Sequence, residues 1–264
     1  MPFQYFEGLK FYSFSSFEKD VRHGIFTRLG GSSPDPWKSL NMGSTVGDEN
    51  GRVAQNRQLA FDALKLDSKS LFDAWQVHST TVALAVAPRG ADDDYQKADI
   101  ILTDQPYVTL MMRFADCTPI LLHDPVNKVI GLVHAGWMGT VKMAAKIAVE
   151  AMVENYGSKP EDIRAAIGPS IGPDHYQIGA DVAKDVLNTF GENNHVLIKQ
   201  SDGKFHFDLW EGNRLLLQTA GVKEIEIAGL CTACNLGDWY SHRAENGKTG
   251  RFGFFASLEK VDDR

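Results

Sequence analysis

Short apolar runs, many of them rich in β-branched residues, recur through the middle of the chain and predict β-strands. Polar or turn residues separate the runs. The predicted strands cover residues 71–75, 81–87, 98–103, 108–114, 118–123, 129–133, 163–167, 224–227 and 252–258. Because the connections between residues 98 and 133 are too short for a helical crossover, we expect antiparallel or mixed pairing in this region.

Other segments repeat apolar residues with a helical period. They cover residues 52–64, 140–155, 180–190 and 210–219, and Gly221 provides a stop signal after the last of them. The turn cluster at residues 30–35 and the polar stretch at residues 89–97 predict surface loops. Helices therefore interleave with strands that pair without crossovers. This order favours an α+β fold in layers, with a mixed, largely antiparallel β-sheet core, over a purely parallel sheet.

Length and composition are those of an ordinary globular protein. The 264 residues are 43% hydrophobic and 23% charged, which is enough apolar material for one large core. We therefore expect a single domain over residues 1–264, or two closely packed halves. The net charge of −7 argues against sequence-independent binding of nucleic acid, because such binding requires clustered Lys and Arg. A small-molecule partner is the better expectation.

We expect neither a membrane-spanning segment nor a secretory signal. No apolar stretch approaches the length of about 18 residues that spans a bilayer. The start, MPFQYFEGLKFYSF, is amphipathic and lacks the basic-then-apolar order of a signal peptide. We expect a cytoplasmic protein without a membrane partner.

The three cysteines, Cys117, Cys231 and Cys234, are too few and too unevenly placed for a disulfide framework. The Cys-x-x-Cys pair Cys231 and Cys234 follows a predicted strand, which is also the context of a thioredoxin-like redox motif. Such a motif needs a helix after its second cysteine, whereas residues 235–238 are typical of a turn. We interpret the pair as packing residues or as part of a pocket wall.

Three side chains that suit zinc stand near the ends of predicted strands: His78, Cys117 and His134. A thiolate with two imidazoles is a common donor set for zinc, and three protein ligands leave the fourth tetrahedral position open, as in catalytic sites. The competing interpretation is a buried, packing cysteine and two histidines with ordinary polar partners. The spacing matches no zinc-finger pattern, so the grouping depends on loops that converge in the fold.

Several motifs in order carry a resemblance to a known family. They are His23-Gly24-Ile25-Phe26-Thr27-Arg28-Leu29-Gly30-Gly31, Leu40-Asn41-Met42-Gly43 with Val46-Gly47-Asp48, Gln76-Val77-His78, Ala115-Asp116-Cys117-Thr118-Pro119, His134-Ala135-Gly136-Trp137, and Cys231-Thr232 with Gly250-Arg251. Through nearly its whole length the chain strongly resembles the laccase-domain purine nucleoside phosphorylase family, whose members were formerly classed as multicopper polyphenol oxidases.

The resemblance implies a layered α/β/α arrangement with a single metal ion bound by His78, Cys117 and His134. It also implies phosphorolysis of adenosine, inosine, guanosine and methylthioadenosine with phosphate as co-substrate, and deamination of adenosine. The donor set makes zinc the metal that we expect. Two positions depart from the family pattern. Thr45 stands where histidine is common, and Ser79 stands where glycine is common, which leaves the substrate range open.

The older oxidase label conflicts with the histidine pattern of the chain. Multicopper oxidases build a trinuclear copper cluster largely from His-x-His pairs, in addition to a blue-copper site. The eight histidines of this chain include no such pair. A four-copper relay is therefore not expected, although Cu²⁺ could occupy the same His/Cys/His site in place of Zn²⁺.

Further residues have candidate roles in nucleoside chemistry. Asp116 is the nearest carboxylate to Cys117 and is either a proton shuttle or a residue that orients a loop or a ligand. Arg28 and Arg243 are candidates for binding phosphate, although each could be an ordinary surface arginine. Asn41 and Gln76 lie in the family motifs, and the resemblance implies that they bind substrate.

Other functions use the same residues. Cys117 as a nucleophile, with His134 or His78 as its base, would make a cysteine hydrolase that cleaves an amide, for example in a cell-wall precursor peptide. A single-copper polyphenol oxidase and a non-enzymatic metal-binding or partner-binding module are further alternatives. The sequence does not determine the oligomeric state.

Overall fold

Two six-stranded sheets form the body of the molecule. The computed structural model describes residues 2–90, 93–192 and 195–259. Sheet 1 has the spatial order β1 (Phe3–Phe6), β2 (Leu9–Tyr12), β3 (Val21–Phe26), β15 (Phe252–Leu258), β7 (Thr109–Phe114), β4 (Leu71–Asp73). Sheet 2 has the order β14 (Glu224–Ile227), β10 (Arg164–Ile167), β8 (Thr118–Asp124), β9 (Val129–Ala135), β6 (Ile100–Thr103), β5 (Val82–Leu84). Three pairs, β4–β7, β5–β6 and β10–β14, are parallel, and the other pairs within these sheets are antiparallel.

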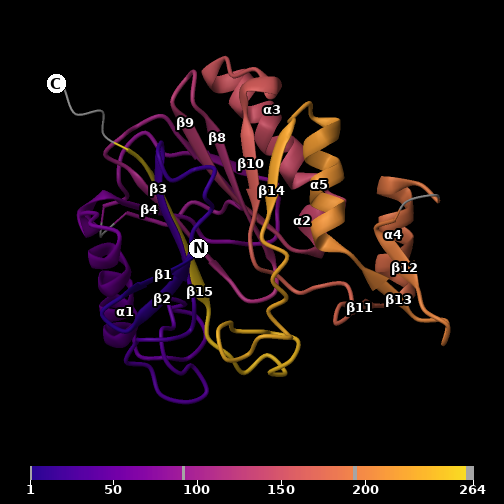
Figure 1. Ribbon diagram of the computed structural model, residues 1–264, viewed down its shortest axis with the longest axis horizontal. Coiled ribbons are helices and arrows are strands. Elements are labelled where there is room, and N and C mark those ends of the chain that lie inside the picture. The colour runs from indigo at the N-terminus through magenta and orange to yellow at the C-terminus, as the bar shows by residue number, and fades with distance from the viewer. Residues whose placement is uncertain (1, 91–92, 193–194, 260–264) are drawn as a thin grey trace.

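The two sheets pack against each other, and helices cover their outer faces (Figure 1). α1 (Asn50–Ala63) packs on sheet 1, where Phe61 meets Phe255. α3 (Ala144–Tyr156) and α5 (Leu209–Thr219) pack on sheet 2, and α2 (Trp137–Val141) directly precedes α3. The β layer of the expected α/β/α arrangement is thus a pair of sheets, and the expected α+β class with mixed, largely antiparallel sheets is confirmed.

The strands β8 and β9 are buried along their whole length because they are covered on both faces. Leu121 of β8 belongs to the core between the sheets, whereas its neighbours Ile120 and Leu122 belong to the core under α3 and α5. This double burial explains why these strands are continuous apolar runs rather than alternating ones.

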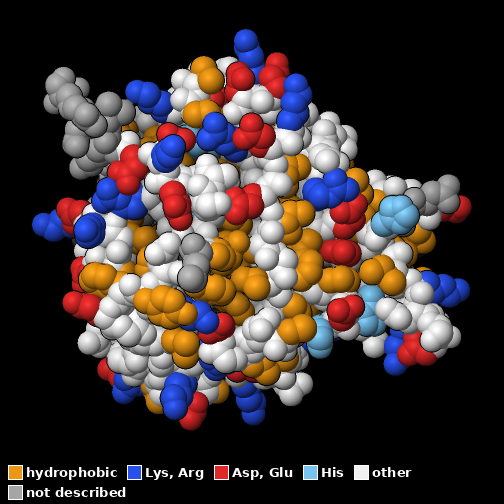
Figure 2. Space-filling model, viewed as in Figure 1, with side chains coloured by type: hydrophobic (Ala, Val, Ile, Leu, Met, Phe, Trp, Pro, Cys, Tyr) orange, Lys and Arg blue, Asp and Glu red, His pale blue; other side chains and the backbone are white. Residues whose placement is uncertain are grey.

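A small third unit projects to one side of the body (Figures 1 and 2). It consists of α4 (Ala180–Phe190) and a three-stranded antiparallel sheet with the order β11 (Gln177–Ile178), β13 (Phe205–Phe207), β12 (Leu197–Lys199). Its own apolar cluster includes Ile171, Val186 and Phe207. The 3₁₀ turns η1 (Ser68–Ser70) and η2 (Pro160–Asp162) complete the described elements.

The predicted strands are present, with ends that differ by a few residues, and the predicted segments at residues 180–190, 224–227 and 252–258 match the structure residue by residue. The helix predicted over residues 140–155 is instead divided between α2 and α3, because Met143 has a φ of 62° and interrupts the helical path. The strands β1, β2 and β3 were not predicted, nor were those of the small sheet. Residues 91 and 92 of the predicted loop 89–97 lie outside the described residues.

Within the described chain, no helix has both the length and the apolar character needed to cross a membrane. On the face drawn in Figure 2, acidic and basic side chains intermingle over the body, and histidine side chains gather on and near the projecting unit.

Candidate metal centre and substrate pocket

His78, Cys117 and His134 come together between the two sheets. His78 lies in the loop after β4, Cys117 in the turn between β7 and β8, and His134 near the end of β9. Cys117 Sγ lies 3.8 Å from His78 Nε2, and the donor atoms of all three residues lie within 4.8 Å of one another. We call this group the first cluster. The loops therefore converge as the zinc hypothesis requires.

The first cluster fits a tetrahedral metal ion such as zinc. Bonds of about 2.3 Å to sulfur and about 2.0 Å to nitrogen, at tetrahedral angles, place sulfur and nitrogen about 3.5 Å apart. A Cβ at Gly136 would lie 2.7 Å from Cys117 Sγ, so glycine keeps the space beside the sulfur open. The same donor set also suits copper, and the geometry does not separate the two metals.

Asp99 organises two of the three donors of the cluster. This buried carboxylate accepts a hydrogen bond from His134 Nδ1 at 2.8 Å, which leaves Nε2 as the nitrogen for a metal. It also accepts from the backbone amides of Val77, His78 and Ser79 at 3.1, 3.0 and 2.6 Å, and from Ser79 Oγ at 2.8 Å. One side chain thus fixes both the His134 ring and the loop that carries His78.

In the metal-free cluster, the pKa values favour a negative charge on Cys117 and a positive charge on His134. Burial favours the neutral Cys117 thiol, but the charge of His134 and hydrogen bonds from His134 and His78 outweigh it and lower the Cys117 pKa to about 6. Burial likewise opposes charge on His134, yet the Cys117 thiolate and Asp99 raise its pKa to about 9. Burial opposes charge on Asp99 too, but hydrogen bonds and charge from His134 and bonds from Ser79 lower its pKa to about 2. A thiolate is the form that binds metal ions.

Two residues at the cluster have left-handed backbone conformations that non-glycine residues rarely adopt. The φ of His78 is 58°, and the φ of Asp116 is 78°. Such conformations persist only where surrounding contacts hold them, and they gather at functional sites. Asp99 supplies those contacts for His78 through the amides of the loop.

A cavity of about 500 Å³ opens onto the first cluster. This volume suits a small-molecule ligand. Aromatic side chains of its wall are Trp75, Tyr95, Trp137 and Tyr176, and its cationic side chains are Arg113, Arg243 and Arg251. The cavity therefore combines flat apolar surfaces with positive charge beside a group that can bind a metal.

Asp116 and Arg243 both line this cavity and are linked to each other. Asp116 Oδ2 accepts from the Arg243 amide, and Asp116 Oδ1 accepts from Thr232 Oγ1, both at 2.6 Å. The Arg243 guanidinium lies 5.1 Å from the centre of the Tyr176 ring and donates to the Gln177 carbonyl at 2.8 Å. The structure thus brings these two predicted residues to the cavity, with the Asp116 carboxylate holding the segment that carries Arg243.

Gln76 also lines the cavity, where its side chain binds the backbone of Arg113. Its Nε2 donates to the Arg113 carbonyl at 2.8 Å, and its Oε1 accepts from the Arg113 amide at 2.9 Å. These contacts attach the loop after β4 to β7. Gln76 is therefore both part of the wall and a residue that holds it.

The structure does not bring Arg28 to the cavity wall. Its guanidinium donates to the carbonyls of Lys38 and Leu236 at 2.9 and 3.0 Å and pairs with Glu245 at 3.0 Å. It also lies 4.5 Å from the centre of the Tyr240 ring. These contacts join the N-terminal turn to the C-terminal loops, and they occupy the guanidinium that was expected to bind phosphate.

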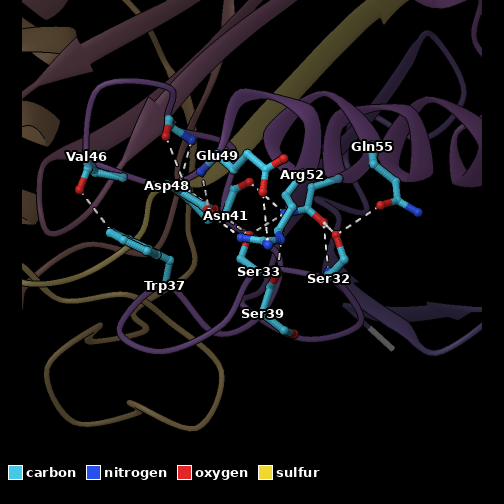
Figure 3. A network of polar contacts seen from close by, with 12 residues as sticks. Ser32, Ser33, Trp37, Ser39, Asn41, Val46, Asp48, Glu49, Arg52 and Gln55 are labelled. Atoms are coloured by element: carbon cyan, nitrogen blue, oxygen red, sulfur yellow. Dashed lines mark hydrogen bonds and ion pairs between the residues drawn. The ribbon is translucent and has the colours of Figure 1, made fainter.

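Asn41 is fully buried in a polar network (Figure 3). It is not part of the cavity wall. Its Nδ2 donates to Asp48 at 2.9 Å, and its Oδ1 accepts from the amides of Gly43 and Arg251 at 3.0 and 2.9 Å. Gly43 and Arg251 both line the cavity. Asn41 thus positions two parts of the wall without facing the ligand space.

Sequence reasoning missed Asp99 and gave no role to Arg251 or Tyr176. The signal for Asp99 was a carboxylate inside the apolar run at residues 98–103, because a charged residue in a buried strand needs a partner. Arg251 belongs to the Gly-Arg motif quoted above, and its pKa is lowered because the guanidinium is buried, while Cys117 and Asp116 oppose this shift. Nothing in the local pattern marked Tyr176.

The fold and the first cluster define a class of two-sheet α+β proteins with a His/Cys/His centre. The family model described as multi-copper polyphenol oxidoreductase laccase matches residues 22–259, and the chain belongs to this family. The chain is 39% identical to a purine nucleoside phosphorylase of Deinococcus radiodurans, over 88% of this chain and 87% of the relative. It is 35% identical to the purine nucleoside phosphorylase YlmD of Bacillus subtilis strain 168, over 92% and 90% of the two chains.

Solved structures agree with this assignment. YlmD from Geobacillus stearothermophilus superposes with a TM-score of 0.91 at 33% identity, and the match covers 98% of this chain and 99% of the other. The Bacillus licheniformis protein YfiH gives a TM-score of 0.90 at the same identity and the same coverage. The family resemblance found in the sequence is confirmed.

Proposed function

We propose that this chain is a zinc-dependent purine nucleoside phosphorylase whose metal is bound by His78, Cys117 and His134. The observation that carries the proposal is the first cluster, held by Asp99 and opening onto a cavity of about 500 Å³. The names of the relatives, purine nucleoside phosphorylase, support the same activity. The cluster takes its ligands from loops and strands of both sheets, which supports our further proposal that residues 1–264 act as one domain.

The cavity wall suits a purine nucleoside. Aromatic rings such as Trp75, Trp137 and Tyr176 offer faces on which a planar base can stack, and such contacts add about 1 kcal/mol beyond the burial of area. Thr45 offers a hydroxyl at the same wall, and Gln76, whose side-chain amide binds the Arg113 backbone, holds that wall in place. Thr45 is one of the two departures from the family pattern, so it is the residue at which we expect the substrate range to differ.

Arg243 and Arg251 are the groups that we propose for phosphate. Both line the cavity, and a guanidinium can donate two parallel hydrogen bonds to a phosphate. Arg251 Nη1 donates to the carbonyls of Thr249 and Gly250 at 3.2 and 2.9 Å, which fixes the direction of its remaining donors. In phosphorolysis, phosphate attacks the anomeric carbon of the ribose while the bond to the purine breaks. Positioned cations keep the phosphate beside that carbon.

A zinc ion at the first cluster would supply Lewis-acid chemistry, which polarises an oxygen atom or lowers the pKa of water. The protein side chains position the metal ligands and shield the substrate. Asp99 keeps His134 and the His78 loop in place, and the aromatic wall excludes water from the base.

We also propose adenosine deamination at this site. Asp116 is the only carboxylate that lines the cavity among the described residues, so it is our candidate for proton transfer in that reaction.

A second candidate function has a specific observation in its favour. In the metal-free cluster, the lowered pKa of Cys117 and the raised pKa of His134 make a thiolate and an imidazolium, which is also the pairing of a cysteine nucleophile with its base. A cysteine hydrolase acting on an amide would use this pair without a metal. Zinc or copper bound to the thiolate would block such an attack.

Product analysis by chromatography tests the proposal. Protein of known zinc content is incubated with adenosine, inosine, guanosine or methylthioadenosine, with and without phosphate, beside Cys117→Ala and His195→Ala proteins. His195 is exposed and does not line the cavity, so its variant is the matched control. We expect release of the free base that depends on phosphate, with inosine from adenosine as a second product.

The variants decide where the reaction takes place. Loss of both products in Cys117→Ala protein, with both retained in His195→Ala protein, assigns them to the first cluster. No product from any of these nucleosides in zinc-loaded wild-type protein would overturn the proposal. Covalent trapping of Cys117 by an alkylating amide analogue in metal-free protein would then favour the hydrolase.

A further inference from the structure

Another group of soft donor side chains lies apart from the first cluster. His175 is in the loop between β10 and β11, and Cys231 and Cys234 are in the loop after β14. His175 Nδ1 lies 3.5 Å from Cys234 Sγ and 3.9 Å from Cys231 Sγ, and the three donor atoms lie within 4.8 Å of one another. We call this group the second cluster. None of its residues lines the cavity described above.

The backbone fixes the second cluster in place. Ser170 and Cys231 form a parallel bridge, in which the Thr232 amide donates to the Ser170 carbonyl at 3.1 Å. The Gly172 amide donates to Cys231 Sγ at 3.2 Å. A Cβ at Gly172 would lie 3.2 Å from Cys231 Cβ, so glycine allows this close approach. The donors meet because the fold joins their loops.

We propose that His175, Cys231 and Cys234 bind a second Zn²⁺ ion. The distances of 3.5 and 3.9 Å between nitrogen and sulfur lie close to the separation of about 3.5 Å that tetrahedral zinc imposes. The Cys-x-x-Cys spacing is common in zinc-binding loops, where a turn brings two sulfur atoms to one ion. His175 and Cys234 are exposed, so water or another solvent ligand completes the shell.

The structure favours zinc over a redox role for this cysteine pair. All three cysteines are free thiols. The segment after Cys234 forms turns at residues 236–238, and no helix of the described chain begins there. A thioredoxin-like pair needs such a helix to stabilise its thiolate. His175 supplies a third donor instead, which suits zinc and has no part in a simple disulfide.

The second cluster is connected to the wall of the cavity. Thr232, between its two cysteines, donates to Asp116, whose other oxygen accepts from the Arg243 amide. Tyr176 follows His175 directly and lies beneath the Arg243 guanidinium. A bound ion would thus hold both the loop that orients Asp116 and the segment that carries Tyr176. The fourth coordination position of this ion would face solvent rather than the cavity, because none of the three ligands lines the cavity. We therefore infer that the ion acts as a structural clip and that its ligands are positioning residues rather than catalytic ones.

Counting zinc tests this proposal without any measurement of turnover. Full-length protein is reduced, its three thiols are confirmed by titration, and bound zinc is counted after excess Zn²⁺ is removed. We expect two equivalents for the wild type. His175→Ala, Cys234→Ser and, separately, Cys117→Ser should each lose one equivalent, whereas His195→Ala should keep both. Cobalt adds a spectroscopic readout: sulfur-to-metal absorption should be stronger in Cys117→Ser protein, which keeps two thiolates, than in Cys234→Ser protein.

Two results would overturn the proposal. The first is a single equivalent in fully reduced wild-type protein that Cys117→Ser abolishes and His175→Ala leaves unchanged. The second is a disulfide between Cys231 and Cys234 whose reduction adds no zinc. Because zinc is counted in Cys117→Ser protein as well, a failed phosphorylase assay and a missing second ion are separate outcomes.

Discussion

The first and second clusters combine the same donor types in opposite proportion and in opposite surroundings. The first, with two imidazoles and one thiol, lies between the sheets and is organised by the buried Asp99. The second, with two thiols and one imidazole, has exposed members and is organised by backbone contacts and the Gly172 amide. A carboxylate can tune an imidazole, whereas a backbone scaffold only places its donors. This difference separates a centre suited to chemistry from one suited to structure.

The largest expected effect contrasts one cysteine from each cluster. We expect Cys117→Ser to lower the rate of phosphorolysis by at least about 10²-fold, because the metal and its Lewis-acid chemistry are lost. Cys234→Ser should lower it by less than about tenfold, because the second cluster acts only through the loop that holds Asp116. Steady-state kinetics with inosine measure both. Equal losses in the two variants would show that the clusters do not differ in the way we describe.

The next effect concerns Asp99. Asp99→Asn keeps the shape of the side chain but removes its charge, so His134 and the amides of the His78 loop lose a charged acceptor. We expect the zinc affinity of the first cluster to fall by about 10- to 100-fold, while the second cluster is unaffected. Competition with a chromogenic chelator measures both affinities. An unchanged zinc affinity at the first cluster would show that Asp99 does not set this cluster apart from the second.

The sequence predicts the type of side chain at this site better than the position of that side chain in the fold. The group of His78, Cys117 and His134 could be predicted because side chains that can bind a metal belong to few residue types and because motifs surround these three. Their convergence could not, since it depends on the register that pairs Pro119 with His134 across β8 and β9. Arg28 shares a motif with functional residues, but a motif does not reveal which way a side chain points. Its contacts with Glu245 and Tyr240 join segments far apart in the chain.

The same distinction applies to the fold. The central strands were predictable because burial on both faces makes them continuous apolar runs, as in β8. The N-terminal strands were not, because β1 is an edge strand with partly exposed residues and resembles an amphipathic segment of either type. The interruption at Met143 was also invisible, since its left-handed backbone falls inside an unbroken helical period. Local pattern predicts an element, whereas its edges depend on tertiary contacts.

His123, a buried histidine outside both clusters, shows what happens to the pKa of a buried imidazole without a partner such as Asp99. His123 faces the core between the sheets near Phe17, and its Nδ1 has no hydrogen-bond partner within the described chain. Burial lowers its pKa from 6.5 to about 4, and the charges of Asp20, Arg164 and Asp124 make smaller contributions. Burial likewise opposes charge on His134, but its partners reverse the sign of the shift.

This lowered pKa predicts a pH dependence of stability. Between pH 6.5 and 4 the unfolded chain binds a proton at His123 that the folded chain does not, so stability falls as the pH falls through this window. We expect a loss of about 2 kcal/mol in the free energy of unfolding between pH 6.5 and 5 from this residue. Urea unfolding across this range measures it. His123→Gln should reduce the slope of the free energy of unfolding against pH. The slope that remains would come from His23, because burial lowers its pKa as well. An unchanged slope would contradict the argument.

The smallest expected effect tests the contact between the two clusters. Thr232→Val keeps the shape of the side chain but removes the hydrogen bond to Asp116 Oδ1. One hydrogen bond contributes a net of about 1 kcal/mol, and Asp116 keeps its bond from the Arg243 amide, so we expect kcat/KM to fall by no more than about fivefold. Thr232→Ser, which keeps the hydroxyl, should restore the rate, and both variants should retain zinc at both clusters.

If Thr232→Val lost zinc instead, the loop itself rather than the Asp116 contact would be at fault. If Thr232→Val protein kept the full kcat/KM, the second cluster would stabilise the protein without influencing the cavity. The reason is that the hydrogen bond from Thr232 to Asp116 directly links the loop of the second cluster to the cavity wall.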